Sequence, residues 1–241
     1  FLGSEALAAV GSAFTLMTFL TSILPGLAMG SGTVFSVRFG EKDHFGLREG
    51  VLASFVLLGI VTLVLNVLIF VGLDWIILAL RTPSELVGLM RDYLRVIFAG
   101  LIGIFLYNFF ASLLRSLGNS VVPLAFLAVS AGLNIALDLW FVAGLGRGVA
   151  GAAEATVIAQ YVSGIGIAVY TRLKFPALLR RERGVRLRLS RIREIAGYSG
   201  LTCLQQSIMN LGILAVQGLV NSFGATVMAA FAAAVKIDSF A

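Results

Sequence analysis

Most of this chain consists of apolar stretches that are long enough to cross a lipid bilayer. A spanning helix needs about 20 predominantly apolar residues, because it rises about 1.5 Å per residue and the hydrocarbon core is about 30 Å thick. The composition agrees, since 59% of the residues are hydrophobic and only 12% are charged, against about 25% charged in an ordinary soluble domain. The sequence therefore predicts an integral membrane protein with an all-α fold.

Polar interruptions divide these stretches into six predicted spans and a truncated seventh. The predicted spans cover residues 5–38, 46–72, a third segment ending near 115–118, then 120–143, 151–170 and 194–222, and a seventh starting near 225. We expect residues 74–95 to form an interfacial connection into the third span, with Trp75 in the headgroup belt. The expected fold is a polytopic membrane helical bundle, and the chain looks like an excerpt of a longer protein.

The first predicted span contains Pro25, followed by Gly26 and Gly30. A proline inside a helix predicts either a fixed kink or a hinge. Two glycines four residues apart form a small-xxx-small pattern, which lets a neighbouring helix approach closely. We expect Cys203 to be a packing residue, and as the only cysteine it allows no intrachain disulfide.

Basic residues are concentrated between residues 174 and 193, where eight of them are opposed only by Glu182. A run of this kind beside a span predicts a cytoplasmic loop. Alternation of the spans then places Arg38, Arg48 and Arg115 on the same side. The loop either determines topology alone or also binds a specific lipid or partner. Because the net charge of +6 comes from residues beside apolar spans, we expect no nucleic acid partner.

The fourth predicted span carries Asn134 and Asp138 within the sequence LNIALDLW. Residues four positions apart lie on one face of a helix, so the amide and the carboxylate share a face. A carboxylate at the centre of a span costs about 2.5 to 3.5 kcal/mol, and a chain usually keeps one there for its function. The alternative is that Asp138 caps or anchors a helix end near the membrane interface.

The sequence contains no constellation typical of a membrane-embedded enzyme. The only histidine, His44, lies in a predicted loop, and Cys203 lies in an apolar stretch. These residues do not supply a nucleophile and a base, or a metal cluster, within the spans. We therefore expect a protein that is not an enzyme and that has no cofactor. The polar pair in the fourth span also counts against a purely structural role.

A short repeated segment in the sequence predicts two similar halves. Residues 3–10 resemble residues 224–231, with the glycine and two alanines at equivalent positions. Each copy opens a predicted span, and six spans separate the two copies, as in the parallel repeats of several transporter folds. We therefore predict two helical bundles joined by the basic loop.

The chain resembles the multidrug and toxic compound extrusion (MATE) family over essentially its whole length. The resemblance rests on the order and spacing of the segments LGSEALAAVG, FSVRFGEKD, LLRSLGN, LNIALDLWFV, GVAGAAEATVIAQ and the stretch 200–237. It implies twelve helices in two six-helix lobes around a central cavity, and export driven by entry of sodium or protons. On this resemblance, residues 1–173 are the N-terminal lobe without its first helix, residues 174–193 are a linker, and residues 194–241 begin the C-terminal lobe.

The resemblance also implies a cation site in the first lobe, formed by Asn134, Asp138 and Thr156 with Tyr93 nearby. An aspartate on a preceding helix would complete it. The oxygen atoms of these side chains are hard ligands that suit an alkali cation such as Na⁺. A carboxyl group in a low-dielectric setting also holds a proton more readily than in water, so coupling to H⁺ through Asp138 is equally open. Thr156 alternatively bonds back to its own helix.

Three positions depart from the family pattern. Thr202 stands where proline is common, which puts the kink expected in the sixth span in doubt. Asn210 stands where another branch carries glutamate, so we infer no carboxylate site in the second lobe. Glu154 replaces an apolar residue, and it either faces the cavity and attracts cations or lies at the outer end of its helix.

These expectations lead to one function and one alternative. We expect an antiporter, coupled to Na⁺ or H⁺, that exports organic, cationic or amphipathic drugs and toxic compounds. The alternative is a flippase for lipid-linked oligosaccharides or polysaccharides, whose cavity would carry several basic residues to meet pyrophosphate. We expect membrane lipids as partners, a monomeric full-length protein, and location in the plasma (inner) membrane of a prokaryote with residues 174–193 cytoplasmic.

Overall fold

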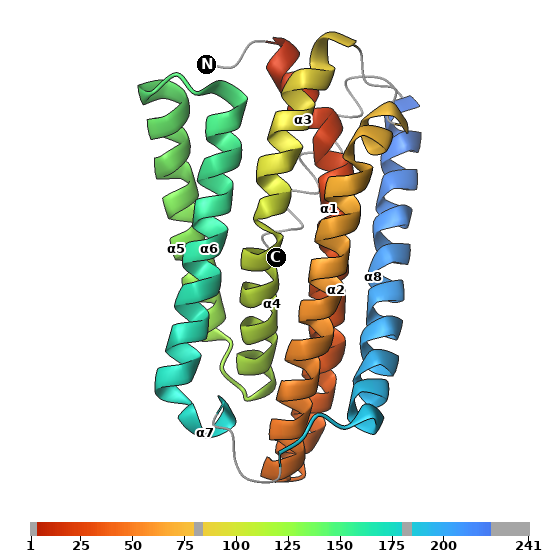
Figure 1. Ribbon diagram of the computed structural model, residues 1–241, viewed down its shortest axis with the longest axis vertical. Coiled ribbons are helices and arrows are strands. Elements are labelled where there is room, and N and C mark those ends of the chain that lie inside the picture. The colour runs from red at the N-terminus through yellow and green to blue at the C-terminus, as the bar shows by residue number, and fades with distance from the viewer. Residues whose placement is uncertain (1–3, 80–83, 180–184, 223–241) are drawn as a thin grey trace.

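The computed structural model describes residues 4–79, 84–179 and 185–222 of the chain. Long helices lie side by side with their axes running along one direction (Figure 1). In chain order they are α1 (Ser4–Gly40), α2 (His44–Ala79), α3 (Ser84–Ala99), α4 (Leu101–Ser116), α5 (Val121–Asp138), the π-helix η1 (Leu139–Gly144), α6 (Gly148–Lys174), α7 (Pro176–Leu179) and α8 (Leu189–Ser222). No strand occurs within the described ranges, so the predicted all-α class is confirmed.

The predicted spans correspond to these helices. Four stretches of the described residues are long and apolar enough to cross a membrane: His44–Trp75, Met90–Ser116, Val121–Gly144 and Gly148–Lys174. The helices α1 and α8 contain 37 and 34 residues, which is also more than one crossing needs. The predicted seventh span and the second copy of the repeated segment lie outside the described residues.

The interfacial connection predicted over residues 74–95 agrees with the limits of the candidate spans, one of which ends at Trp75 and the next of which begins at Met90. The described part of this stretch is helical, because α2 continues into it and α3 begins within it. In α3, Met90 and Leu94 are buried in the core, whereas Asp92 and Arg95 are exposed. This spacing is that of an amphipathic helix. The polar residues therefore mark the outer face of α3 and do not interrupt the fold.

The third span consists of α3 and α4, which meet at Gly100 and together lie in the middle of the bundle (Figure 1). Its core contacts are aromatic. The ring of Phe55 on α2 lies 5.2 Å from the rings of both Phe105 and Phe109 on α4, measured between centroids. Aromatic pairs at this separation add to the stabilisation that burial of their surface provides. The end of this span at Ser116 agrees with the predicted end near residues 115–118.

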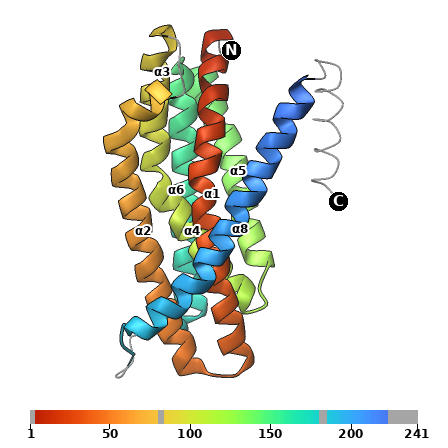
Figure 2. The same cartoon turned by 90° about the vertical axis from the view of Figure 1, so that its right-hand side faces the viewer.

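The helix α8 crosses α1 obliquely and diverges from it toward one end of the bundle (Figure 2). Two glycines of α1 make this crossing possible. A Cβ atom on Gly26 would lie 2.9 Å from Cα of Cys203, and one on Gly30 would lie 2.4 Å from Cα of Ser199. The predicted close approach of a neighbouring helix is therefore confirmed, and Cys203 is a packing residue. The helix α1 runs through Pro25 as one element.

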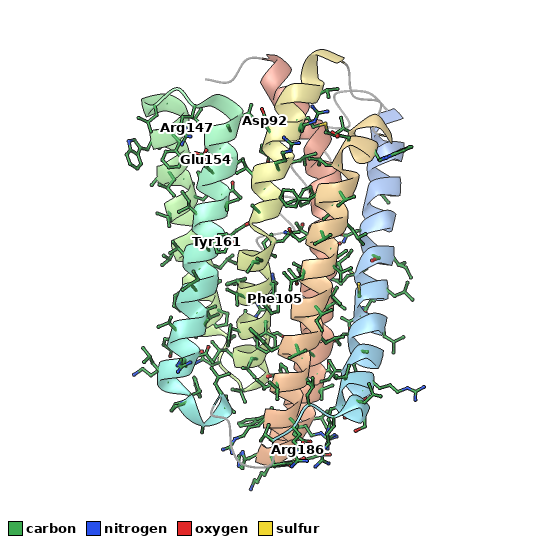
Figure 3. The ribbon with its side chains drawn as sticks, viewed as in Figure 1. Asp92, Phe105, Arg147, Glu154, Tyr161 and Arg186 are labelled. Carbon is green, nitrogen blue, oxygen red and sulfur yellow. The ribbon has the colours of Figure 1, made fainter. Side chains whose placement is uncertain are left out.

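Successive long helices run in opposite directions, so their described ends alternate between the two ends of the bundle (Figure 3). The loops next to Arg38 and Arg115 lie at the same end as residues 185–193, and we call this the basic end. Arg186 lies at the basic end, whereas Arg147 lies at the opposite end. The alternation of spans predicted from the charges is thus confirmed for the described helices.

A buried carboxylate organises the basic end. Glu49 on α2 is only 1% exposed, and its oxygens lie 3.1 Å from Nε of Arg188 and 3.5 Å from Nε of Arg191. Arg191 also pairs with Glu194 at 2.8 Å, and Glu194 pairs with Arg38 of α1 at 2.9 Å. These ion pairs tie the segment before α8 and the first turns of α8 to α1 and α2.

Candidate functional site

A row of polar side chains runs along the contact between α5 and α6. On α5 these side chains recur every four residues, so they occupy one face of the helix. Hydrogen bonds join α5 to α6 at three levels. From α5, Ser130 donates to the carbonyl of Ala159 at 3.0 Å and Asn134 donates to Thr156 at 3.2 Å. From α6, Ser163 donates to the carbonyl of Phe126 at 3.3 Å. We call Ser130, Asn134, Asp138, Thr156, Gln160 and Ser163 the polar stripe.

Asn134 and Thr156, two members of the site that the resemblance implied, are in direct contact. The Nδ2 amide nitrogen of Asn134 donates to Oγ1 of Thr156, and the Thr156 hydroxyl donates to the carbonyl of Ala152 at 3.0 Å. The bond from Thr156 back to its own helix is therefore present, and because a hydroxyl donates one hydrogen bond and accepts two, one lone pair of Oγ1 remains for a further interaction. The amide orientation directs Oδ1 of Asn134 away from Thr156, as an acceptor on the other side of the group.

Asp138 lies one helical turn beyond Asn134, at the junction of α5 and η1. Its Oδ1 atom is buried and has no hydrogen-bond partner among the residues that the structure describes. Asp138 precedes the first residue of η1, but its side chain makes no capping hydrogen bond there. The capping part of the alternative considered for Asp138 therefore has no support, although Asp138 is the last residue of α5 and does lie at a helix end. A buried acceptor without a partner costs about 1 to 3 kcal/mol, and more if it is charged.

The helix changes its winding directly after Asp138. Leu145 donates to the carbonyl of Trp140 at 2.9 Å, a bond that spans five residues. Such π-helical turns are rare and occur frequently at functional sites. No pattern that we identified in the sequence predicts this turn. It ends where Gly146 and Gly148 adopt positive φ angles of 64° and 58°, which glycine permits at low cost.

Tyr93 lies on α3. Its side chain is 8% exposed and belongs to the main apolar core. The structure therefore brings together Asn134 and Asp138 on α5 with Thr156 on α6, whereas Tyr93 lies in the core on α3.

A cavity of about 340 Å³ opens at the other end of the polar stripe, between α1, α4, α5 and α6. Ser130, Gln160 and Ser163 of the stripe line it, and Pro25 of α1 lies in its wall. The Oε1 atom of Gln160 is buried and has no hydrogen-bond partner among the described residues. Our sequence reasoning did not select Gln160 as a site residue. The available signal was its position four residues after Thr156 and three before Ser163 on an otherwise apolar helix.

Glu154 lies outside this cavity. Its carboxylate forms an ion pair with the guanidinium of Arg147, and both residues lie near the end of α6 opposite the basic end (Figure 3). Of the two roles considered for Glu154, the position at the outer helix end is the one that the structure supports.

The chain matches the MatE family model over residues 1–140. It is 29% identical over 241 residues to a probable multidrug resistance protein, YpnP, of Bacillus subtilis strain 168. This match covers 99% of the chain and 53% of YpnP, so the chain spans about half the length of that relative.

Solved structures of MATE family transporters are also similar to this chain. An outward-facing structure of a multidrug resistance MATE family transporter superposes with a TM-score of 0.86 at 26% identity, covering 99% of this chain and 53% of that one. An inward-facing structure of such a transporter superposes with a TM-score of 0.75, covering 99% of this chain and 55% of that one. The arrangement of the described helices is thus nearer to the outward-facing form of these two.

Proposed function

This chain belongs to the multidrug and toxic compound extrusion (MATE) family, and we propose that its protein is a cation-coupled antiporter that exports organic, cationic or amphipathic molecules. The observation that carries this proposal is the buried, unpartnered Oδ1 atom of Asp138. A carboxylate in this setting is stabilised by binding Na⁺ or a proton, either of which satisfies the acceptor.

The donor set around Asp138 fits a hard cation. The carboxylate, the Oδ1 atom of Asn134 and the remaining lone pair of the Thr156 hydroxyl are all oxygen ligands, which alkali and alkaline-earth cations prefer. The same carboxylate can take up a proton without any further ligand. The coupling ion is therefore Na⁺ or H⁺, and both act at the same residue.

The cavity at the other end of the polar stripe supports an organic substrate. None of its described lining residues carries a charge, and Thr21, Asn108 and Gln160 offer hydroxyl and amide groups beside apolar walls. Such a lining suits molecules that combine an apolar body with a few polar groups. It does not suit a pyrophosphate headgroup, which would require basic side chains, so the flippase alternative is disfavoured.

Substrate and cation are coupled through a shared element. Ser130 and Ser163 line the cavity, and Asp138 lies two turns beyond Ser130 on the same face of α5. Cation binding at Asp138 stabilises one arrangement of α5 against α6, and substrate binding in the cavity favours another. Coupling of this kind requires that each ligand bind the two conformations with different affinity.

The protein works in the plasma (inner) membrane of a prokaryote, with the basic end in the cytoplasm. The positive-inside rule supports this orientation, because the basic end carries the excess of arginine and lysine. Export then moves substrate toward the end that carries Arg147 and Glu154.

The test is dye efflux from membrane vesicles that contain the protein in its full natural length, with sodium and proton gradients collapsed separately. We expect efflux to depend on one gradient and to be abolished by Asp138→Asn, while the amount of protein in the membrane is unchanged. The matched control is Glu154→Gln, which removes the same charge from the neighbouring helix and should leave the gradient dependence intact.

Retained, gradient-driven efflux in Asp138→Asn would remove this residue from the mechanism. If neither gradient nor substitution affects any cationic dye, the antiporter proposal is wrong and the flippase alternative takes its place.

A further inference from the structure

A second pocket, at the basic end, has no part in the transport cycle proposed above. It has a volume of about 630 Å³ and lies between α2, α4 and α6, with α7 and residues 185–187 closing one side. Its polar rim consists of Arg48, Arg172 and Arg186, and its apolar wall includes Leu52 and Phe55. We propose that this pocket binds an anionic phospholipid, with the phosphate at the arginines and an acyl chain along α2.

The first argument is charge. Among the arginines of the basic end, Arg188 and Arg191 form ion pairs with the carboxylate of Glu49. In contrast, Arg172 and Arg186 form no ion pair with a carboxylate in the part of the chain that the structure describes. No acidic residue is found among the described residues that line the pocket. The pocket therefore carries net positive charge, which an anionic group would balance.

The second argument is the position of these arginines. Arg48 lies in the second turn of α2 and Arg172 in the last turn of α6, and Arg186 lies at the same end of the bundle (Figure 3). Helix ends at this level lie among lipid headgroups in a membrane. Guanidinium groups bind phosphate oxygens through paired hydrogen bonds, and basic pockets between helices on this side bind anionic headgroups.

The third argument is an apolar path that leads out of the pocket. Leu52 and Phe55 are 37% and 39% exposed, so the wall of the pocket opens to the surroundings. Leu63 and Phe70 lie on the same face of α2 as Leu52, about three and five turns further along the helix than Leu52. They are 57% and 43% exposed, and they continue the apolar surface along α2 past its middle. An acyl chain fits this path, whereas a free phosphate would leave it uncovered.

The test is native mass spectrometry of the protein in its full natural length, purified in detergent and titrated with dioleoyl phosphatidylglycerol. Phosphatidylcholine with the same chains tests the charge of the headgroup, and glycerol 3-phosphate tests the headgroup without chains. We expect preferential binding of phosphatidylglycerol, which glycerol 3-phosphate does not displace. The double variant Arg172→Gln, Arg186→Gln should bind it roughly 25-fold more weakly, since each basic residue near a membrane contributes about fivefold.

The matched control is the double variant Arg115→Gln, Arg193→Gln. It removes two positive charges from exposed positions at the same end, outside the pocket, and should change the affinity by less than about twofold on the same scale. If the first double variant does not elute as a single species, Arg172→Gln alone provides the test with about a fivefold loss.

Three results would each overturn the proposal. The first is an equal loss of binding in the control variant, which would reduce the effect to general electrostatics. The second is phosphatidylcholine binding as tightly as phosphatidylglycerol, and the third is displacement by glycerol 3-phosphate, which would indicate a bare anion site.

Discussion

The amide nitrogen of Asn134 lies 3.2 Å from the hydroxyl oxygen of Thr156, and this hydrogen bond joins α5 to α6 beside the carboxylate of Asp138. It fixes the orientation of two oxygen donors before any ion arrives. A site whose ligands are already held in place loses less conformational entropy on binding. Under the proposed function, we expect the pair to contribute to cation affinity in addition to the packing of the two helices.

Removal of the Thr156 hydroxyl should weaken the binding of the coupling ion. In Thr156→Val, we expect the ion concentration at half-maximal efflux to rise about fivefold, corresponding to about 1 kcal/mol for one hydrogen-bonding group. Thr156→Ser keeps the hydroxyl and should stay within about twofold of the original protein on that scale. The measurement is efflux from vesicles over a series of sodium concentrations and pH values. An unchanged ion dependence in the valine variant would exclude Thr156 as a ligand.

A methyl group at Gly30 should destabilise the crossing of α1 and α8. The added Cβ atom would lie 2.4 Å from Cα of Ser199 and 2.6 Å from the backbone nitrogen of the same residue, so one helix has to shift. Overpacking of this kind costs about 1 to 3 kcal/mol. We expect Gly30→Ala to lower the melting temperature of the purified protein in detergent.

The control for this variant is Gly72→Ala in α2, where nothing lies within 4 Å of the added atom. Alanine favours a helix over glycine by about 1 kcal/mol, so this variant should melt at the same temperature or higher. Equal melting of the two variants would contradict the close approach of α1 and α8.

Neutralising Glu49 should destabilise the basic end. Glu49→Gln removes the charge that Arg188 and Arg191 surround, at a side chain that is 1% exposed. We expect the free energy of unfolding to fall by roughly 2 kcal/mol, within the range for hydrogen bonds to charged groups. Urea denaturation in detergent measures this. Glu41→Gln, whose carboxylate is 54% exposed and pairs with Arg38, should cost less than about 1 kcal/mol, and a larger effect there would contradict our account.

The helical class, the number of spans up to residue 222 and the common end of the basic loops all followed from the sequence. They depend on properties that are local or additive along the chain, namely hydropathy over about 20 residues and the charge of short loops. The same holds for the shared face of Asn134 and Asp138, which the helical repeat determines. The helical form of residues 84–95 did not follow in this way, because charged residues on one face of α3 resemble a polar connection when their spacing is ignored.

The tertiary structure alone decided which distant residues meet. Asn134 bonds Thr156 across two antiparallel helices, and Gly30 meets Ser199 from the opposite end of the chain, because the register of packed helices depends on side chains of both partners. Glu49 reads in sequence as an ordinary exposed acid near a helix start, and it is buried only because residues 188–191 fold over it. Packing likewise decides that Arg188 and Arg191 pair with Glu49 whereas Arg172 and Arg186 line a pocket.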